Sequence, residues 1–249
     1  AMPEDIARYA GEYDLGWDSL RVRRYERLLR LGIIKPVTAL TPRDAEVKPW
    51  AELPVKTRQE MARKMEVYAA QVDRMDQGIG RILDKLKETG KEENTVVIFL
   101  SDNGGCGEGG PEGFNRRDNG LPPGGVDSYM SYGQSWANAS NTPFRYFKKW
   151  LHEGGISTPF IVRWPAGIQK QRHGQIMEQV GHVTDIMPTL CALSGAQYPA
   201  YYKNKKILPM EGQSLLPAIE QGTVQPHRPV FWFLDGHSAM LDGNDKLET

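Results

Sequence analysis

A run of five apolar residues, Val96 to Leu100, ends at a carboxylate, a carboxamide and two glycines. Its length and its β-branched side chains are typical of a buried strand, and the glycines mark where the strand stops. Asp102 and Asn103 then lie at the carboxyl end of that strand, the edge of an open α/β sheet where ligands bind. Paired oxygen ligands suit a hard divalent cation such as calcium. The segment therefore predicts an α/β fold with a metal site at one sheet edge.

The same segment also has simpler interpretations. Asn-Gly is a common turn signal, and taken alone it says little about metal binding. Residues 105–110 match the G-x-G-x-x-G spacing of a dinucleotide loop. A dinucleotide fold needs a helix to begin there, whereas Pro111 and some thirty irregular residues follow. The nucleotide interpretation is therefore rejected, while the turn and the metal site both stay open.

The strongest helical periodicity lies between Thr57 and Thr89, where apolar residues recur at spacings of three and four. Its methionines are expected in the core rather than in a cofactor site. Residues 104–143 are rich in glycine, proline, asparagine and serine, and they are predicted to form a long loop without a helix or strand. The other predicted elements are helices over residues 14–31 and 184–193 and strands over residues 160–164 and 228–234.

Composition narrows the class of partner. The 31 basic and 31 acidic side chains balance, so bulk charge favours neither nucleic acid nor an anionic membrane surface. No apolar stretch approaches the roughly 20 residues of a membrane span. Two cysteines, Cys106 and Cys191, allow at most one disulfide and leave the redox compartment open. We therefore expect no nucleic-acid partner and no membrane partner.

A second polar segment follows the long loop. Lys148 and Lys149 are solvated surface charges on the simplest interpretation, or anion ligands for sulfate or phosphate on the functional one. His152 beside Glu153 is a structural pair at a turn or part of a site. The two glycines that follow indicate a tight backbone path into the next predicted strand.

Two further motifs carry little functional weight. His182 and Asp185 favour a helix start over a catalytic pair, because a short helix is predicted to begin there. Asn138-Ala139-Ser140 matches a glycosylation acceptor, a motif with many false matches.

With these segments in view, the chain resembles the arylsulfatases of the alkaline phosphatase superfamily. The resemblance covers almost the whole sequence, from Pro3 to about Lys246. It rests on the order, spacing and surroundings of several segments. They are Leu100 to Gly105, Lys148 to Pro165, Met65 to Gly80, Ser131 to Asn138, Asp185 to Thr189 and Leu208 to Pro217.

The resemblance implies a fold and a set of site residues. The fold is the sulfatase α/β sandwich, a mixed sheet flanked by helices, of which residues 1–196 form the C-terminal part; residues 197–249 begin a smaller C-terminal subdomain. Asp102 and Asn103 match calcium ligands, and Lys148 matches the lysine that contacts the substrate sulfate. His152 is a further catalytic candidate, whereas Lys149 is expected to point outward.

The mechanism that the resemblance implies begins with a formylglycine, made from a cysteine or serine after translation. Its hydrate attacks sulfur, the alcohol leaves, and the sulfated diol then releases sulfate. Calcium and Lys148 offset charge on the sulfuryl oxygens. The substrate is thus a sulfate ester, held selectively by the loop over residues 111–143, Tyr132 and Trp136 included. The resemblance also implies a periplasmic or secreted location.

The motif that yields formylglycine, Cys or Ser followed by x-Pro/Ala-x-Arg, fits neither Cys106 nor Cys191. We therefore expect the nucleophile in a missing N-terminal half of the same polypeptide, and we expect this chain to be inactive alone. Asp102 and Asn103 supply two of the six to eight oxygens that calcium prefers. Without the first strands of the sheet, an exposed sheet edge is expected to favour oligomers.

Two other functions remain as alternatives. One is a phosphodiesterase or phosphonate hydrolase of the same superfamily, which is ranked lower because no second Asp/His cluster follows Asp102. The other is a non-catalytic module that binds sulfated glycans. Its basic side chains are those of Lys148, Arg116, Arg117 and Arg145.

Overall fold

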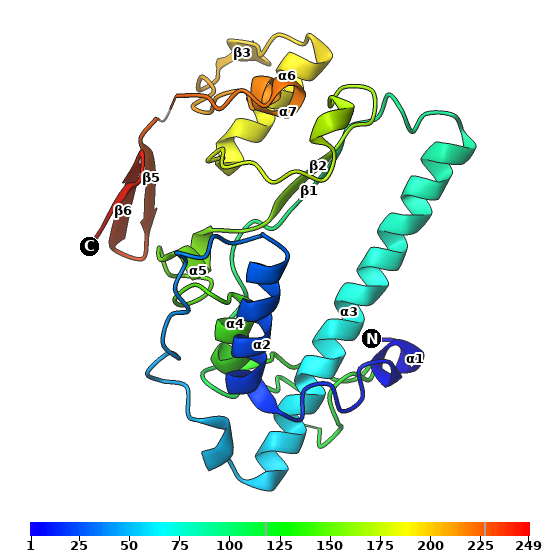
Figure 1. Cartoon of the computed structure of the whole chain (residues 1–249), viewed down its shortest axis with the longest axis vertical. Helices are drawn as coiled ribbons and strands as arrows, with labels where there is room; N and C mark the ends of the chain where they lie inside the picture. Colours follow the sequence, from blue (N-terminus) through cyan, green and yellow to red (C-terminus); the bar gives the residue numbers. More distant parts are fainter. Residues whose placement is uncertain (118, 227) are drawn as a thin grey trace. The chain divides into compact units, whose positions relative to one another are not determined.

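The computed structural model describes residues 1–117, 119–226 and 228–249, and Figure 1 traces the chain through its elements. It contains two compact units, each assembled from several segments. The first comprises Ala1–Lys85, Asn103–Pro159 and Leu234–His237; the second comprises Leu86–Asp102, Phe160–Phe233 and Ser238–Thr249. The predicted boundary between residues 196 and 197 stays a prediction.

Helices dominate the first unit. The predicted helices over residues 14–31 and 57–89 are confirmed as α2 and α3, and α2 packs against the later helix α4. The last residues of the long helix α3, from Leu86 on, are assigned to the second unit. The helices of this unit are α1 (Pro3–Ala7), α2 (Gly16–Arg30), α3 (Val55–Glu88), α4 (Gly133–Ser140) and α5 (Glu153–Ile156), with a 3-10 turn, η1, at Trp50–Glu52.

Helix α4 corrects the prediction that residues 104–143 hold no regular element. Its sequence, GQSWANAS, has weak helix propensity. Six of its eight residues are buried, and tertiary packing of this kind stabilises short helices that composition disfavours. The sequence pattern missed the helix because its stability comes from contacts with distant residues.

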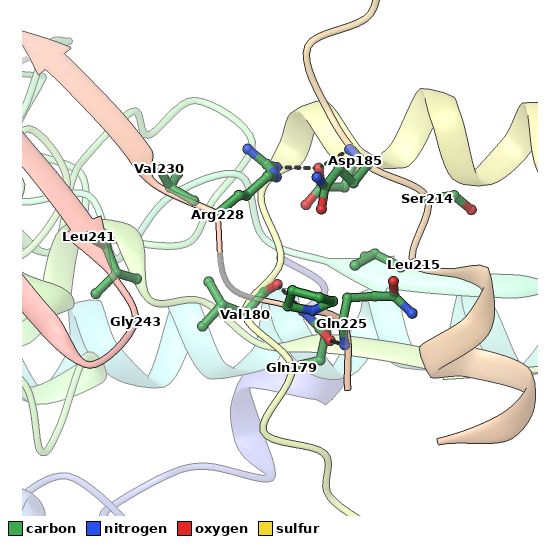
Figure 2. Close-up of a pocket in the computed structure, with 12 residues that line it drawn as sticks. Gln179, Val180, Asp185, Ser214, Leu215, Gln225, Arg228, Val230, Leu241 and Gly243 are labelled. Atoms are coloured by element: carbon green, nitrogen blue, oxygen red, sulfur yellow. Dashed lines mark hydrogen bonds and ion pairs between the residues drawn. The ribbon is translucent and has the colours of Figure 1, made fainter. Parts of the chain in front are cut away.

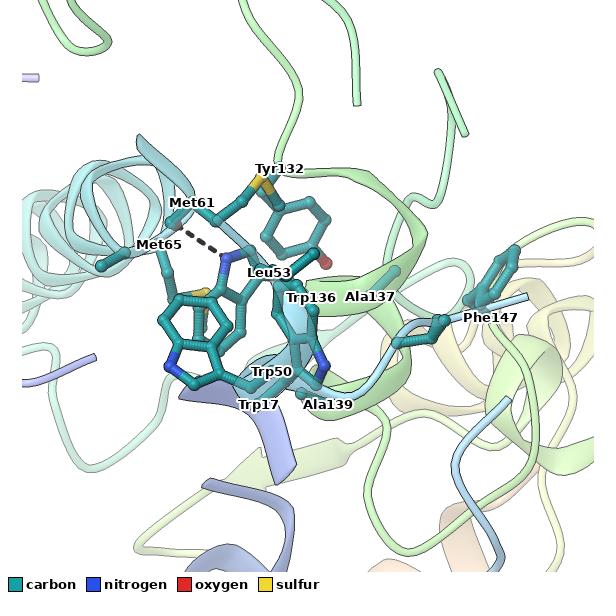
Figure 3. Packing of buried hydrophobic residues seen from close by; sticks show 12 residues of the cluster. Trp17, Trp50, Leu53, Met61, Met65, Tyr132, Trp136, Ala137, Ala139 and Phe147 are labelled. Atoms are coloured by element: carbon teal, nitrogen blue, oxygen red, sulfur yellow. Dashed lines mark hydrogen bonds between the residues drawn. The ribbon is translucent and has the colours of Figure 1, made fainter. Parts of the chain in front are cut away.

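Three tryptophans pack together in the core of the first unit (Figure 3), with Trp17 edge to face against both Trp50 and Trp136. The ring of Trp136 lies 5.4 Å from that of Trp17 and 5.8 Å from that of Trp50. Its indole nitrogen donates a hydrogen bond to the backbone oxygen of Met61 at 2.8 Å. Trp136 is fully buried and Tyr132 is 8% exposed, so both belong to the core. The prediction that these two side chains select the substrate is therefore wrong.

The methionine stripe of α3 is core over only part of its length. Met61 and Met65 are 1% and 7% exposed, whereas Met75 and Ile82 are 48% and 62% exposed. The buried half packs into the tryptophan cluster. The exposed half has the same periodicity, so the pattern marks an apolar face but does not tell which part of that face is covered.

The second unit begins with two antiparallel strands, β1 (Val97–Leu100) and β2 (Phe160–Arg163), in which Val97 pairs with Arg163 and Leu100 with Phe160. Both were predicted, but β1 is only half-buried, and Phe160 and Ile161 of β2 are exposed. A two-stranded sheet leaves much of its surface open, which explains the difference.

The remaining elements of the second unit are short. A 3-10 turn leads into α6, which confirms the helix predicted for residues 184–193. Strand β5 confirms the strand predicted over residues 228–234. Among the described residues no helix is both long and apolar enough to cross a membrane. These elements are η2 (Lys170–Arg172), η3 (Val183–Asp185), α6 (Ile186–Ser194), β3 (Tyr201–Tyr202), β4 (Lys205–Lys206), α7 (Leu216–Gln221), β5 (Val230–Leu234), β6 (His237–Asp242) and β7 (Asp245–Glu248), the last three forming one sheet.

Candidate functional site

The turn after β1 carries the two predicted metal ligands. Asp102 is exposed and Asn103 is half-buried. The Asn103 amide nitrogen donates to the backbone oxygen of Gly104 at 2.8 Å, which fixes the orientation of the carboxamide. A carboxylate and a carboxamide oxygen are the hard donors that calcium prefers. The described residues contain no group of three or more His, Cys, Asp or Glu able to hold a metal, so this pair fits calcium only as part of a larger ligand set.

Glycines let this turn touch the second predicted segment, backbone against backbone. The Gly104 nitrogen donates to the Gly155 oxygen at 2.9 Å. A Cβ atom on Gly104 would stand 1.8 Å from the Gly154 oxygen, and one on Gly154 would stand 2.2 Å from the Tyr146 oxygen. No side chain fits at these distances. The prediction of a tight path at Gly154-Gly155 is therefore confirmed.

Lys148 is tied to the same turn. Its backbone nitrogen donates to the Gly105 oxygen at 2.9 Å. The Gly105 nitrogen in turn donates to the side-chain oxygen of Asn141, also at 2.9 Å, and the Asn141 amide reaches the Tyr146 oxygen at 3.1 Å. The structure thus brings together the glycine turn and the lysine, which the sequence separates by more than forty residues. Asn141 joins them, and no sequence signal pointed to it.

The ammonium group of Lys148 faces an acid. Its Nζ lies 3.4 Å from Glu108 Oε1, and both side chains are about 40% exposed, at 38% and 41%. A pair of this kind contributes little to stability because water screens it. Lys149 is exposed, and its backbone φ of 82° is unusual for a residue with a side chain. Glu108 was missed by sequence reasoning, because it stands among glycines that predict only a loop.

A hollow of about 370 Å³ opens beside Lys148, and all its lining residues belong to the first unit. Its size is typical of small-molecule sites. Lys148 is the only predicted site residue in its lining. The lining residues are Gly107, Glu108, Gly109, Gly110, Gln134, Phe147, Lys148, Lys149, Trp150, Asp235 and His237.

His152, the other predicted catalytic residue, precedes α5 and is half-buried. Its ring packs 4.9 Å from the ring of Tyr146 and 6.3 Å from that of Trp150. It is absent from the lining of the hollow. These contacts give His152 a packing position, and its catalytic role stays a prediction.

A second hollow, in the second unit, surrounds a buried carboxylate (Figure 2). Asp185 forms an ion pair with Arg228 and accepts hydrogen bonds from the backbone nitrogens of His182 and Gln213, each at 2.8 Å. His182 caps the turn η3, with the Asp185 side chain completing a capping box. The predicted helix start is therefore confirmed. These contacts of Asp185 hold segments of the chain together and do not point to catalysis. We call Asp185 with Arg228, His182 and Gln213 the Asp185 clamp.

The same clamp joins two of the segments that carry the sulfatase resemblance. Leu215 donates its backbone hydrogen to Thr189 Oγ1 at 2.8 Å. A Cβ atom on Gly212 would stand 2.1 Å from the Thr184 oxygen. The segments around Asp185 and Gln213 thus meet through contacts that require a hydroxyl at Thr189 and a glycine at Gly212.

Asn138, the residue of the glycosylation motif, is 1% exposed within α4. A glycan needs an exposed acceptor, so the folded unit does not offer Asn138 for this modification.

A family model described as Sulfatase matches residues 3–196. An arylsulfatase of Klebsiella aerogenes is 37% identical over 223 residues, which cover 86% of this chain and 47% of that protein. An uncharacterized sulfatase of Schizosaccharomyces pombe is 34% identical over 256 residues, covering 98% of this chain and 46% of that protein. The chain therefore spans about half the length of these relatives.

Solved structures agree on the fold. A protein solved with its substrate D-glucosamine-2-N,6-O-disulfate is 20% identical with a TM-score of 0.50, over 77% of this chain and 32% of that chain. A phosphonate monoester hydrolase from Silicibacter pomeroyi is 18% identical with a TM-score of 0.51, over 90% of this chain and 44% of that chain. Helices with small sheets, in part of the alkaline-phosphatase-like sulfatase fold, confirm the predicted α/β class. Given the family match over residues 3–196 and relatives above 30% identity, the chain belongs to the sulfatase family.

Proposed function

We propose that the polypeptide carrying this chain hydrolyses sulfuric esters and that Lys148 contacts the sulfate group. The observation that carries the proposal is the direct backbone link between Lys148 and Gly105. It places the predicted anion ligand beside the turn with the predicted metal ligand Asn103, in the same unit. Family membership supplies the reaction class.

Each residue has a distinct task in this proposal. The Lys148 ammonium balances negative charge on the sulfuryl oxygens as it grows in the transition state. The ion pair between Lys148 and Glu108 is exposed and weak. The negatively charged sulfate can therefore replace Glu108 as the partner of the ammonium group. Asp102 and Asn103 hold part of the coordination shell of a calcium ion, which supplies further positive charge when bound.

The nucleophile is proposed to come from another segment of the natural polypeptide. Formylglycine does not fit the cysteines here, because Cys106 is followed by Gly-Glu-Gly-Gly and Cys191 by Ala-Leu-Ser-Gly. No step is therefore assigned to either cysteine, and we expect no turnover by this chain alone. That segment is also the proposed partner for the exposed edge of the β1–β2 sheet.

The test compares two adjacent lysines in the natural polypeptide that contains these residues. Lys148→Ala should lower kcat/KM for 4-nitrophenyl sulfate by roughly 100-fold to 1,000-fold, the usual effect of removing a charge-stabilising donor. Lys149→Ala should have a smaller effect, because Lys149 lines the hollow but its side chain is exposed and is not the proposed sulfate ligand. Equal losses in the two variants, each with an unchanged unfolding temperature, would contradict the role of Lys148.

The glycan-binding module finds less support, because its arginines are engaged elsewhere. Arg116 lies over the rings of Phe114 and Tyr129, at 5.1 and 5.4 Å from their centroids. Arg117 lies 3.4 Å from Asp127. None of Arg116, Arg117 and Arg145 lines the hollow beside Lys148, so these side chains do not form a shared anion site with it.

A further inference from the structure

Part of the hollow beside Lys148 is lined by backbone without side chains. Three of its lining residues are glycines, at positions 107, 109 and 110. Gly107 packs so closely that a Cβ atom there would stand 2.5 Å from the Phe147 ring. A lining without side chains leaves room for a ring-sized group directly next to the lysine that the proposed function assigns to sulfate.

One wall of the hollow is a braced aromatic ring. Trp150 lines it, and its ring stacks on that of Tyr146 with centroids 4.2 Å apart and planes inclined by 13°. The Arg145 guanidinium covers Tyr146 at 4.4 Å and donates to its hydroxyl at 2.8 Å. His237 stands 6.0 Å from the Trp150 ring. A ring held this way offers a preformed surface to another ring, because aromatic faces attract the positive edges of C–H bonds.

The same lining holds hydrogen-bond acceptors. Glu108 presents a carboxylate beside Lys148, and Asp235 adds an exposed second one. Acceptors need donors from a ligand, and a site of this kind rejects an analogue that lacks them. An unsubstituted aryl group provides no donor, whereas a sugar provides several hydroxyls and an apolar C–H face.

We infer that this hollow receives the alcohol part of the sulfate ester and that this part is a sugar ring. The ring stacks on Trp150, and Glu108 accepts a hydrogen bond from a hydroxyl close to the sulfate. The inference rests on the proposed function, because it takes Lys148 as the sulfate ligand. It makes Glu108 and Trp150 specificity residues for sulfated carbohydrates.

The experiment compares two classes of substrate in the natural polypeptide. The sugar substrates are glucose 6-sulfate, galactose 6-sulfate and N-acetylglucosamine 6-sulfate, and the aryl substrate is 4-nitrophenyl sulfate. Glu108→Gln should lower kcat/KM for the best sugar sulfate at least about tenfold more than for the aryl sulfate, since a charged acceptor is lost. Trp150→Ala should shift the ratio in the same direction, and Trp150→Phe, which keeps an aromatic face, should restore most of it.

Glu112→Gln is the matched control, because Glu112 is exposed and lies outside the lining of the hollow. It should leave both rates unchanged. Equal losses on sugar and aryl sulfates in the Glu108 and Trp150 variants would overturn the inference while the proposed function stands. The same holds if the unmodified protein hydrolyses the aryl sulfate but none of the sugars. Hydrolysis of neither class would overturn the proposed function as well.

Discussion

The Trp136 cluster of the first unit and the Asp185 clamp of the second unit are stabilised by different interactions. The first unit buries a cluster of large apolar side chains centred on Trp136, which is fully buried among other tryptophans. The second unit buries a carboxylate, Asp185, at 2% exposure, and fastens separate segments to it by hydrogen bonds and an ion pair. The Trp136 cluster depends on shape and buried apolar area, whereas the segments around Asp185 depend on a few directional contacts.

This difference teaches what a substitution should cost in each place. An apolar cluster loses free energy in proportion to the volume removed and to how poorly its neighbours refill the space. A polar centre loses the favourable bonds and also leaves their buried partners unsatisfied. A tryptophan is large, so the first unit should show the larger single loss.

Trp136→Ala should therefore have the largest effect on stability. The change removes a fully buried ring and its hydrogen bond to the Met61 oxygen, and we expect a loss of about 3–5 kcal/mol in the free energy of unfolding. Urea denaturation followed by circular dichroism measures it. Trp232→Ala is the control, because Trp232 is only half-buried and should cost clearly less. A loss below that of the control would show that the cluster repacks freely.

Asp185→Asn should rank second, at about 3 kcal/mol. The variant keeps the shape of the side chain but removes the charge that Arg228 pairs with, and a buried charge without its partner is costly. The segment near Gln213 should also become the first site of limited proteolysis, since its backbone bond to Asp185 weakens. Asp242→Asn, at an exposed position, is the control. If Asp185→Asn costs more than Trp136→Ala, the contrast between the two interiors is wrong.

How far the sequence predicts each interior follows from the range of the contacts involved. Helix α3 was predicted within two residues of its bounds, because its periodicity is local. Helix α4 was missed, because packing rather than propensity stabilises it. For the same reason Trp136 was assigned to substrate selection, although it lies in the core. A local pattern does not show which distant segment covers a side chain.

In the candidate site too, local features were predicted and contacts between distant residues were not. Glycines at 154 and 155 predicted a tight backbone path, and the structure has it, with Gly104 as the unpredicted partner. Glu108 and Asn141 carried no signal, because their partners are 40 and 36 residues away in sequence. The resemblance supplied Lys148 and the metal ligands, and the structure adds what surrounds them.

The smallest expected effect is the pH dependence of the free energy of unfolding, which depends on His182 next to Asp185. Burial lowers the pKa of His182 below its ordinary value of 6.5, Asp185 opposes this shift, and Arg228 adds to it. The unfolded chain therefore binds a proton at His182 more readily than the folded chain does. Stability from this group is present above pH 6.5 and is lost as the pH falls below it toward the folded pKa.

A hydrogen bond of the turn works in the same direction as burial. The Thr184 nitrogen donates a hydrogen bond to His182 Nδ1 at 3.3 Å, and a protonated Nδ1 cannot accept it. The free energy of unfolding, measured between pH 7.5 and pH 5, should therefore fall more steeply in the unmodified chain than in His182→Asn. Asparagine keeps an acceptor for the cap but does not titrate in this range. Equal slopes would mean that His182 charges without disturbing the turn, and a polar interior of this kind would then tolerate a positive charge beside Arg228.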